Sequence, residues 1–167
     1  LDIEFAKDLQ DWDAEIDKQT LEVRFKSPDV LFGLGSTELK PKFKLILDDF
    51  FPRYLKVLDN YQEHITEVRI EGHTSTDWTG TTNPDIAYFN NMALSQGRTR
   101  AVLQYVYDIK NIATHQQWVK SKFAAVGYSS AHPILDKTGK EDPNRSRRVT
   151  FKVVTNAELQ IRKIIQE

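Results

Sequence analysis

The residues whose chemistry stands out lie in one stretch, Gly72 to Arg100, which leaves an apolar strand and enters a helix. Arg98 belongs to the helical part, and Asp77 lies in the polar loop before it. Free N–H groups at the start of a helix and a guanidinium both favour a carboxylate. An acid nearby could meet an amine. The spacing therefore indicates a site for a small anionic or zwitterionic group.

A strand, a loop and a helix must position these residues. Residues 65–70 alternate apolar and polar side chains with a β-branched bias, which predicts a strand. The segment after it is rich in Thr, Asn, Asp and Gly, and Pro84 argues against regular pairing there, so we expect a long loop. We expect the next helix to begin at a cap on Asn90 or Asn91. Arg98 would then lie about two turns into that helix.

Similar patterns extend over the rest of the chain. We expect further strands at 20–25, 123–128 and 147–154, and further helices at 41–58, within 111–122 and at 156–165. Strands that alternate with helices, closed by a returning strand, predict an α+β fold (an α/β sandwich). Its core would be one mixed sheet of about four strands packed against helices.

The chain divides into three parts on this interpretation. Residues 1–18 are expected to form an amphipathic lead-in helix or linker, because apolar side chains recur there at near-helical spacing. Residues 19–155 form the domain. Residues 156–167 form a C-terminal helix that begins at a capping box.

Composition limits the function. The 167 residues carry a net charge of -1, which gives no overall attraction to nucleic acid. There is no cysteine, and the four histidines show no metal-ligand spacing, so we expect neither a metal nor a cofactor. No apolar run approaches the roughly 20 residues of a membrane span. Because the chain starts at Leu1 without Met, we expect any membrane anchor to lie upstream.

Three motifs together carry a family resemblance. They are Gly72-His73-Thr74, the run Asn91-Met92-Ala93-Leu94-Ser95-Gln96-Gly97-Arg98, and Arg147-Arg148-Val149. In combination they resemble the OmpA-like (OmpA/MotB C-terminal) peptidoglycan-binding domain, over roughly residues 23–154. The resemblance implies a βαβαβ arrangement.

The resemblance also implies a function without catalysis. Domains of this family bind the peptide stem of peptidoglycan, where an Asp takes the amine and an Arg the carboxylate of diaminopimelate. Carried over, the binding residues are Thr74, Ser75, Asp77, Asn91, Leu94, Arg98 and Arg148. The domain would be periplasmic and would anchor a membrane-tethered protein or an ion-driven stator complex to the cell wall. Implied partners are the peptide stem, a membrane ion-channel subunit reached through an upstream segment, and a second copy in a homodimer.

One departure from the family pattern bears on binding. The family Asp directly after Gly-x-Thr is Ser75 here, and a hydroxyl cannot pair with an ammonium as a carboxylate does. Either Asp77 or Asp85 takes its place, or binding is weak.

Other interpretations of single residues stay open. Arg98 could pair with a surface acid, and His73 could be a structural hydrogen-bonding residue. Trp78 could cover the pocket or pack over the helix.

Two other classes of function also stay open. A hydrolase could use Ser75 or Ser95 with His73 and Asp77, although the sequence has no Gly-x-Ser-x-Gly elbow. A protein-protein interaction or oligomerisation module could retain this fold without binding the wall.

Overall fold

The computed structural model of the chain describes residues 1–26, 28–157 and 165. At its centre lies a five-stranded mixed sheet. The strand order is β1 (Ala14–Asp17), β2 (Glu22–Lys26), β5 (Arg148–Thr155), β3 (Ile65–His73) and β4 (Phe123–Gly127). Neighbouring strands are antiparallel except β3 and β4, which are parallel. The α+β class and the mixed sheet are confirmed, and β1 adds one strand to the number expected.

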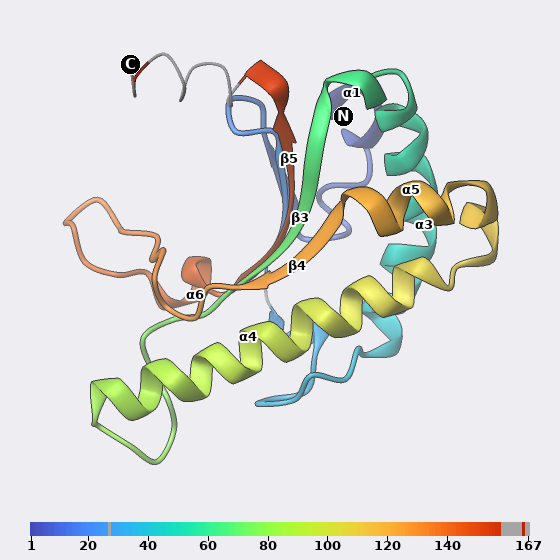
Figure 1. The fold of residues 1–167 in the computed structure, drawn as a ribbon. Coiled ribbons are helices and arrows are strands. Elements are labelled where there is room, and N and C mark those ends of the chain that lie inside the picture. The colour runs from blue at the N-terminus through green and yellow to red at the C-terminus, as the bar shows by residue number, and fades with distance from the viewer. Residues whose placement is uncertain (27, 158–164, 166–167) are drawn as a thin grey trace.

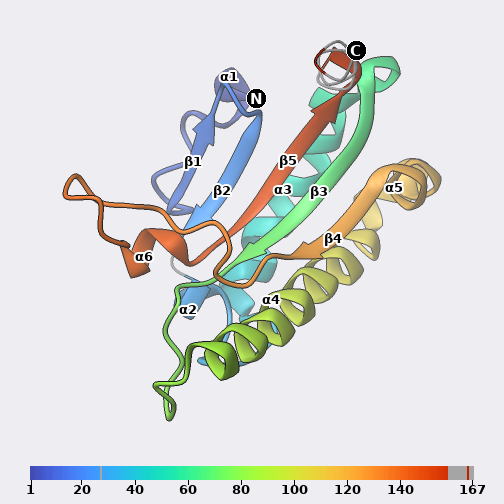
Figure 2. The same cartoon turned by 60° about the vertical axis from the view of Figure 1, so that its left-hand side comes forward.

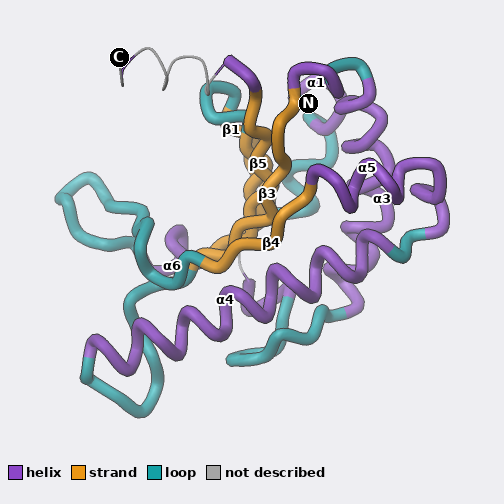
Figure 3. The backbone as a smooth tube through the Cα atoms, in the orientation of Figure 1, coloured by secondary structure: helices purple, strands orange, loops and turns teal. Residues whose placement is uncertain are grey.

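Two long helices, α3 (Pro41–Asp59) and α4 (Pro84–Tyr107), cover the same face of the sheet (Figures 1 and 2). The shorter helices are α1 (Asp2–Phe5), α2 (Pro28–Leu31), α5 (Gln116–Lys122) and α6 (Pro143–Ser146), with 3-10 turns at Gln62–His64 and Lys110–His115. Figure 3 shows the strands as one layer beside the helical layer. In the described part of the chain, no helix combines the length and apolar character that crossing a membrane requires.

Aromatic side chains fill the space between α3 and the sheet. Phe50 of α3 lies 5.1 Å, between ring centroids, from Phe151 of β5 and 5.1 Å from Phe25 of β2. On β5, Val149, Phe151 and Val153 are buried, as the period of two in the sequence predicted. The core therefore lies on the helical face of the sheet.

The expected helix over residues 1–18 is wrong. Only α1 is helical, and β1 pairs with β2 so that Ile16 lies opposite Val23. Asp13, between α1 and β1, has a positive φ of 49°, which is incompatible with a continuous helix. Phe5 and Trp12 are nevertheless buried in the aromatic core, so packing and strand pairing override the helical spacing. The domain boundaries drawn from the sequence stay a prediction.

The predicted start of the helix that carries Arg98 is also wrong. Helix α4 begins at Pro84, and the side chain of Asn83 caps it by accepting hydrogen bonds from the N–H groups of Asp85 and Ile86, at 2.9 and 3.3 Å. Proline suits a first helical position because its missing N–H has no intrahelical partner there. The loop after β3 is therefore shorter than expected, and Asn91 lies within the helix.

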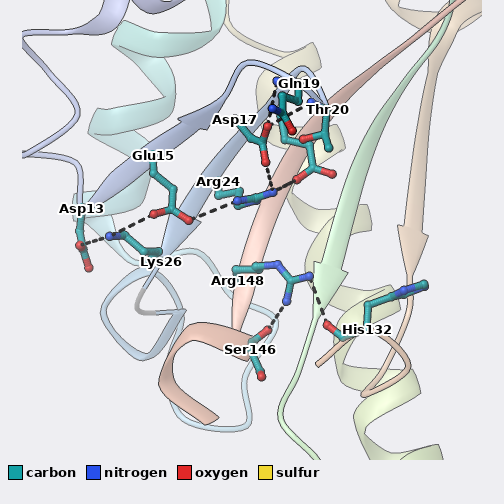
Figure 4. Close-up of polar contacts among 11 residues, drawn as sticks. Asp13, Glu15, Asp17, Gln19, Thr20, Arg24, Lys26, His132, Ser146 and Arg148 are labelled. Carbon is teal, nitrogen blue, oxygen red and sulfur yellow. Dashed lines mark hydrogen bonds and ion pairs between the residues drawn. The ribbon is translucent and has the colours of Figure 1, made fainter. Parts of the chain in front are cut away.

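The exposed face of the β1–β2 hairpin carries a charge network (Figure 4). Arg24 of β2 donates hydrogen bonds from Nε to Glu22 at 2.7 Å and from Nη2 to Asp17 at 2.9 Å. It also forms an ion pair with Glu15 of β1 at 3.4 Å. These contacts join the two strands on the face opposite the core.

The C-terminal helix expected at 156–167 lies almost wholly outside the described residues.

Candidate ligand-binding site

A cavity of about 280 Å³ opens where four segments meet: residues 29–35, the loop after β3, α4, and Arg147 just before β5. It is lined by Asp29, Leu34, Gly35, Thr74, Ser75, Asp77, Trp78, Thr79, Asn91, Leu94, Arg98 and Arg147. A larger cavity of about 550 Å³ lies at the other end of β3, beside Ile65, and its lining is mainly aliphatic. The smaller cavity concentrates charged and hydrogen-bonding groups, so it is the better candidate for a polar ligand.

Two glycines set the position of α4 against the sheet. A Cβ on Gly127, at the end of β4, would lie 2.5 Å from the backbone nitrogen of Gln96. A Cβ on Gly72 of β3 would lie 2.8 Å from the carbonyl oxygen of Ser95. Only glycine allows the middle of α4 to approach both strands this closely. The approach brings the preceding turn of α4, which carries Asn91, to the loop that leaves β3.

Asn91 holds that loop. Its Nδ2 donates hydrogen bonds to the carbonyl oxygens of Ser75 and Asp77, both at 3.1 Å, and the side chain is buried. On the outer side, Thr76 donates through its N–H and its hydroxyl to the carboxylate of Glu141, at 3.0 and 2.5 Å. The loop is therefore tied from both sides. With its amide committed to the backbone, Asn91 is a positioning residue.

Arg98 is buried, with 7% of its surface exposed. Its Nε donates to the carbonyl oxygen of Ser36 at 2.9 Å, and Nη2 donates to that of Gly33 at 3.3 Å. The guanidinium carbon lies 4.8 Å from the ring centroid of Phe32. Among the described residues, Nη1 has no hydrogen-bond partner, and no acid forms an ion pair with Arg98.

The charge of Arg98 is therefore incompletely compensated. Burial lowers the pKa of its guanidinium, the negative charge of Asp29 raises it, and the positive charge of Arg147 lowers it. An arginine stays protonated at neutral pH despite such effects. A buried cation without a carboxylate partner favours an anionic group in the cavity beside it.

Two carboxylates share the cavity with this cation. Asp77 lies on the loop after β3 and Asp29 on α2, and both are exposed at the cavity. Ser75, at the position of the family Asp, is buried and lines the cavity. The structure thus brings a guanidinium and two acids together, a combination suited to a zwitterion.

Six of the seven residues predicted from the sequence line the cavity, and Arg148 does not. The guanidinium of Arg148 donates instead to the carbonyl oxygens of Ser146 at 2.8 Å and His132 at 3.3 Å (Figure 4). Its neighbour Arg147 lines the cavity. Successive side chains at a strand point to opposite sides, so the adjacent arginines separate. Asp85, the other proposed acid, lies in the first turn of α4 and is not among the lining residues.

Several lining residues escaped the sequence analysis. Asp29 and Thr79 belong to no motif, and Asp29 is distant in sequence from Arg98. Trp78 is half-buried and lines the cavity. Covering the pocket was one of the two roles that the sequence left open for it. The resemblance, over roughly residues 23–154, covers residues 29–35 without singling out Asp29.

The hydrolase alternative requires a histidine beside a serine. His73 Nε2 instead lies 3.2 Å from Glu71 Oε1, and no hydrogen bond joins it to Ser75 or Ser95 among the described residues. The Ser95 hydroxyl donates to the carbonyl oxygen of Met92 and accepts from the N–H of Ser129, each at 3.1 Å. These contacts do not assemble a catalytic triad.

A metal site is not formed either in the part of the chain that the structure describes. There, no group of three or more His, Asp or Glu side chains is arranged to hold an ion.

Comparison with known proteins identifies the fold. The family model described as the OmpA family matches residues 31–147. A solved structure of the cell wall anchor of the T6SS from Pseudomonas aeruginosa is 22% identical, with a TM-score of 0.60, over 93% of this chain and 97% of that one. A putative MotB-like protein from Desulfovibrio vulgaris is 21% identical, with a TM-score of 0.60, over 90% and 84% of the two chains. The periplasmic domain of Helicobacter pylori MotB is 17% identical, with a TM-score of 0.57, over 91% and 88%.

Proposed function

Because the chain belongs to the OmpA family, we propose that it binds peptidoglycan non-covalently and without catalysis. The ligand is the peptide stem with its diaminopimelate residue. The domain acts in the periplasm, where it anchors a membrane-tethered protein to the cell wall.

The observation that carries this proposal is the state of Arg98. Its guanidinium is buried and fixed by two backbone carbonyls, yet no described carboxylate pairs with it. It faces a cavity that also contains Asp29 and Asp77. A ligand with both a carboxylate and an ammonium would compensate charges of both signs. The free end of a diaminopimelate side chain is such a group.

The similar structures support the anchoring role. One is described as a cell wall anchor, and another is the periplasmic domain of a MotB protein. A tether between the wall and a membrane complex, including an ion-driven stator with its ion-channel subunit, fits both descriptions. We also propose that the parent protein is a homodimer.

Co-sedimentation with isolated insoluble peptidoglycan tests this function. Wild type should sediment with the wall material, and Arg98→Lys should lose at least about tenfold in affinity because an ammonium cannot reproduce the guanidinium fork. Arg100→Lys is the matched control, since Arg100 is exposed on the same helix and is absent from the cavity lining. Wild type that stays in the supernatant would contradict the proposal, as would full retention of binding by Arg98→Lys.

An interaction module is the second candidate. The first turns of α4 project beyond the sheet (Figure 1) and expose Ile86 and Phe89, at 50% and 68%. Large exposed apolar side chains can mark a protein interface. Self-association that Phe89→Ser abolishes, combined with no binding to peptidoglycan, would favour this candidate.

A further inference from the structure

Two carboxylates in the cavity are available to an ammonium. In the described part of the chain, neither Asp29 nor Asp77 makes a side-chain hydrogen bond or ion pair. Only their backbone oxygens are engaged, Asp29 by Lys40 Nζ at 2.9 Å and Asp77 by Asn91 Nδ2 at 3.1 Å. Burial does not distinguish the two acids, because both are exposed. They differ in how each is connected to Arg98.

The segment that carries Asp29 also holds Arg98. Gly33 and Ser36 accept the two hydrogen bonds from the guanidinium, and the ring of Phe32 lies beneath it. The segment is itself closed, because Phe32 pairs with Leu39 in an isolated β-bridge. Asp29 therefore lies on the same short segment as the groups that hold the guanidinium.

Electrostatics agree with this connection. The charge of Asp29 favours the protonated form of Arg98 and raises the pKa of its guanidinium against the effect of burial. Among the described groups, Asp29 is the carboxylate whose charge acts on Arg98 in this way. Asp77 lies on a different segment, the loop that Asn91 holds.

The ligand's chemistry favours an acid close to the arginine. In the free end of an amino acid, the ammonium and the carboxylate are attached to the same carbon, so their two protein partners must be neighbours. On the premise of the proposed function, we propose that Asp29 binds the ammonium of the zwitterion whose carboxylate binds Arg98. Helix α2 thus supplies the charge that the hydroxyl of Ser75 lacks.

Calorimetric titration with two soluble peptides tests this assignment. One is a stem tripeptide that ends in meso-diaminopimelate with a free amine, and the other is the same peptide with that amine acetylated. Asp29→Asn should weaken binding of the free-amine peptide by about 10- to 100-fold, which is the value of a charge-assisted contact. The acetylated peptide should bind wild type and Asp29→Asn equally weakly, because each change removes the same contact.

Asp85→Asn is the matched control, because Asp85 does not line the cavity, and it should keep the preference of wild type for the free amine. Asp77→Asn tests the competing acid in the cavity. The melting temperature of every variant checks that it is folded. Three results would overturn the inference while the proposed function stands: normal binding by Asp29→Asn, additive losses from Asp29→Asn and acetylation, or loss of the preference in Asp77→Asn alone. If wild type binds neither peptide nor insoluble peptidoglycan, the proposed function and this inference both fail.

Discussion

Asn91 shows how a residue can belong to a binding motif without facing the ligand. The sequence placed it among the binding residues, but both hydrogens of its amide point to the backbone of the loop after β3, at Ser75 and Asp77. Its side chain is buried among these contacts. Asn91 therefore acts on a ligand through the shape of the loop.

Removing this amide should loosen the loop. Asn91→Ala leaves the carbonyl oxygens of buried Ser75 and of Asp77 without their donor, which should cost about 1 to 3 kcal/mol of folding free energy. Backbone amides of residues 76–79 should exchange hydrogen faster, while those of β5 keep their relative protection. Hydrogen exchange followed by mass spectrometry measures both, with Asn90→Ala as the neighbouring control. Unchanged exchange at residues 76–79 would show that other contacts hold the loop.

His73 gives the stability of the protein a pH dependence. Burial lowers the pKa of His73, although Glu71 beside it raises the pKa and the positive charge of Arg148 lowers it. Because the folded protein binds this proton less readily than the unfolded chain does, stability should fall as pH drops below the ordinary histidine value of about 6.5. Burial raises the pKa of Glu71, but the contact with His73 and the positive charges of Lys152 and Arg69 together lower it by more. The pKa of Glu71 is therefore lowered in the fold, which adds a further loss of stability in more acidic solution.

Urea unfolding of wild type and His73→Gln between neutral and mildly acidic pH measures the effect. The wild-type free energy of unfolding should decrease toward acid, and the variant should lose the part of that decrease that begins near the histidine pKa. Identical pH profiles for the two proteins would contradict the role assigned to His73.

Helix α4 connects the sheet to the cavity, and its close approach to β3 and β4 is the critical contact. Gly127→Ala would place a methyl group against the backbone of α4, which cannot rotate away, so it should destabilise the fold by about 1 to 3 kcal/mol. Gly97→Ala is the control on the helix itself. Its Cβ would meet the exposed side chain of Thr37, and alanine gains up to about 1 kcal/mol of helix propensity over glycine.

Thermal unfolding separates the two variants. Gly127→Ala should melt well below wild type, and Gly97→Ala should melt much closer to it. A reversed order would mean that the packing of α4 on β4 is more adaptable than the backbone contacts imply.

Elements with a strong local pattern could be predicted from the sequence. The period of two in β5 identified its buried face, and Pro41 marked the start of α3. The lead-in segment misled because Phe5 reaches the core from the end of the short helix α1 and Trp12 from a turn, at a spacing that one long helix would also have given. The start of α4 was missed because Pro84 was interpreted as a breaker when it occupies the first helical position.

The tertiary structure brings together cavity residues that no local sequence pattern connects. Arg98 and the loop from Thr74 to Asp77 could be predicted because a strand, a turn and a helix in sequence order bring them together. Asp29 and Arg147 come from the two ends of the sheet-forming chain, and only the pairing of β2 with β5 brings those ends to the same place. The family motif pointed to the late arginines, but the contribution of Asp29 to the cavity could not be predicted without the tertiary structure.

The most direct test of the central claim is an NMR titration of the labelled protein with a soluble stem peptide that ends in meso-diaminopimelate. The account predicts saturable shifts at the Arg98 side chain and at the backbone amides of residues 74–79, with the amides around the larger aliphatic cavity unchanged. Shifts confined to the exposed start of α4, or no shifts at saturating peptide, would contradict the claim that this cavity binds the cell wall.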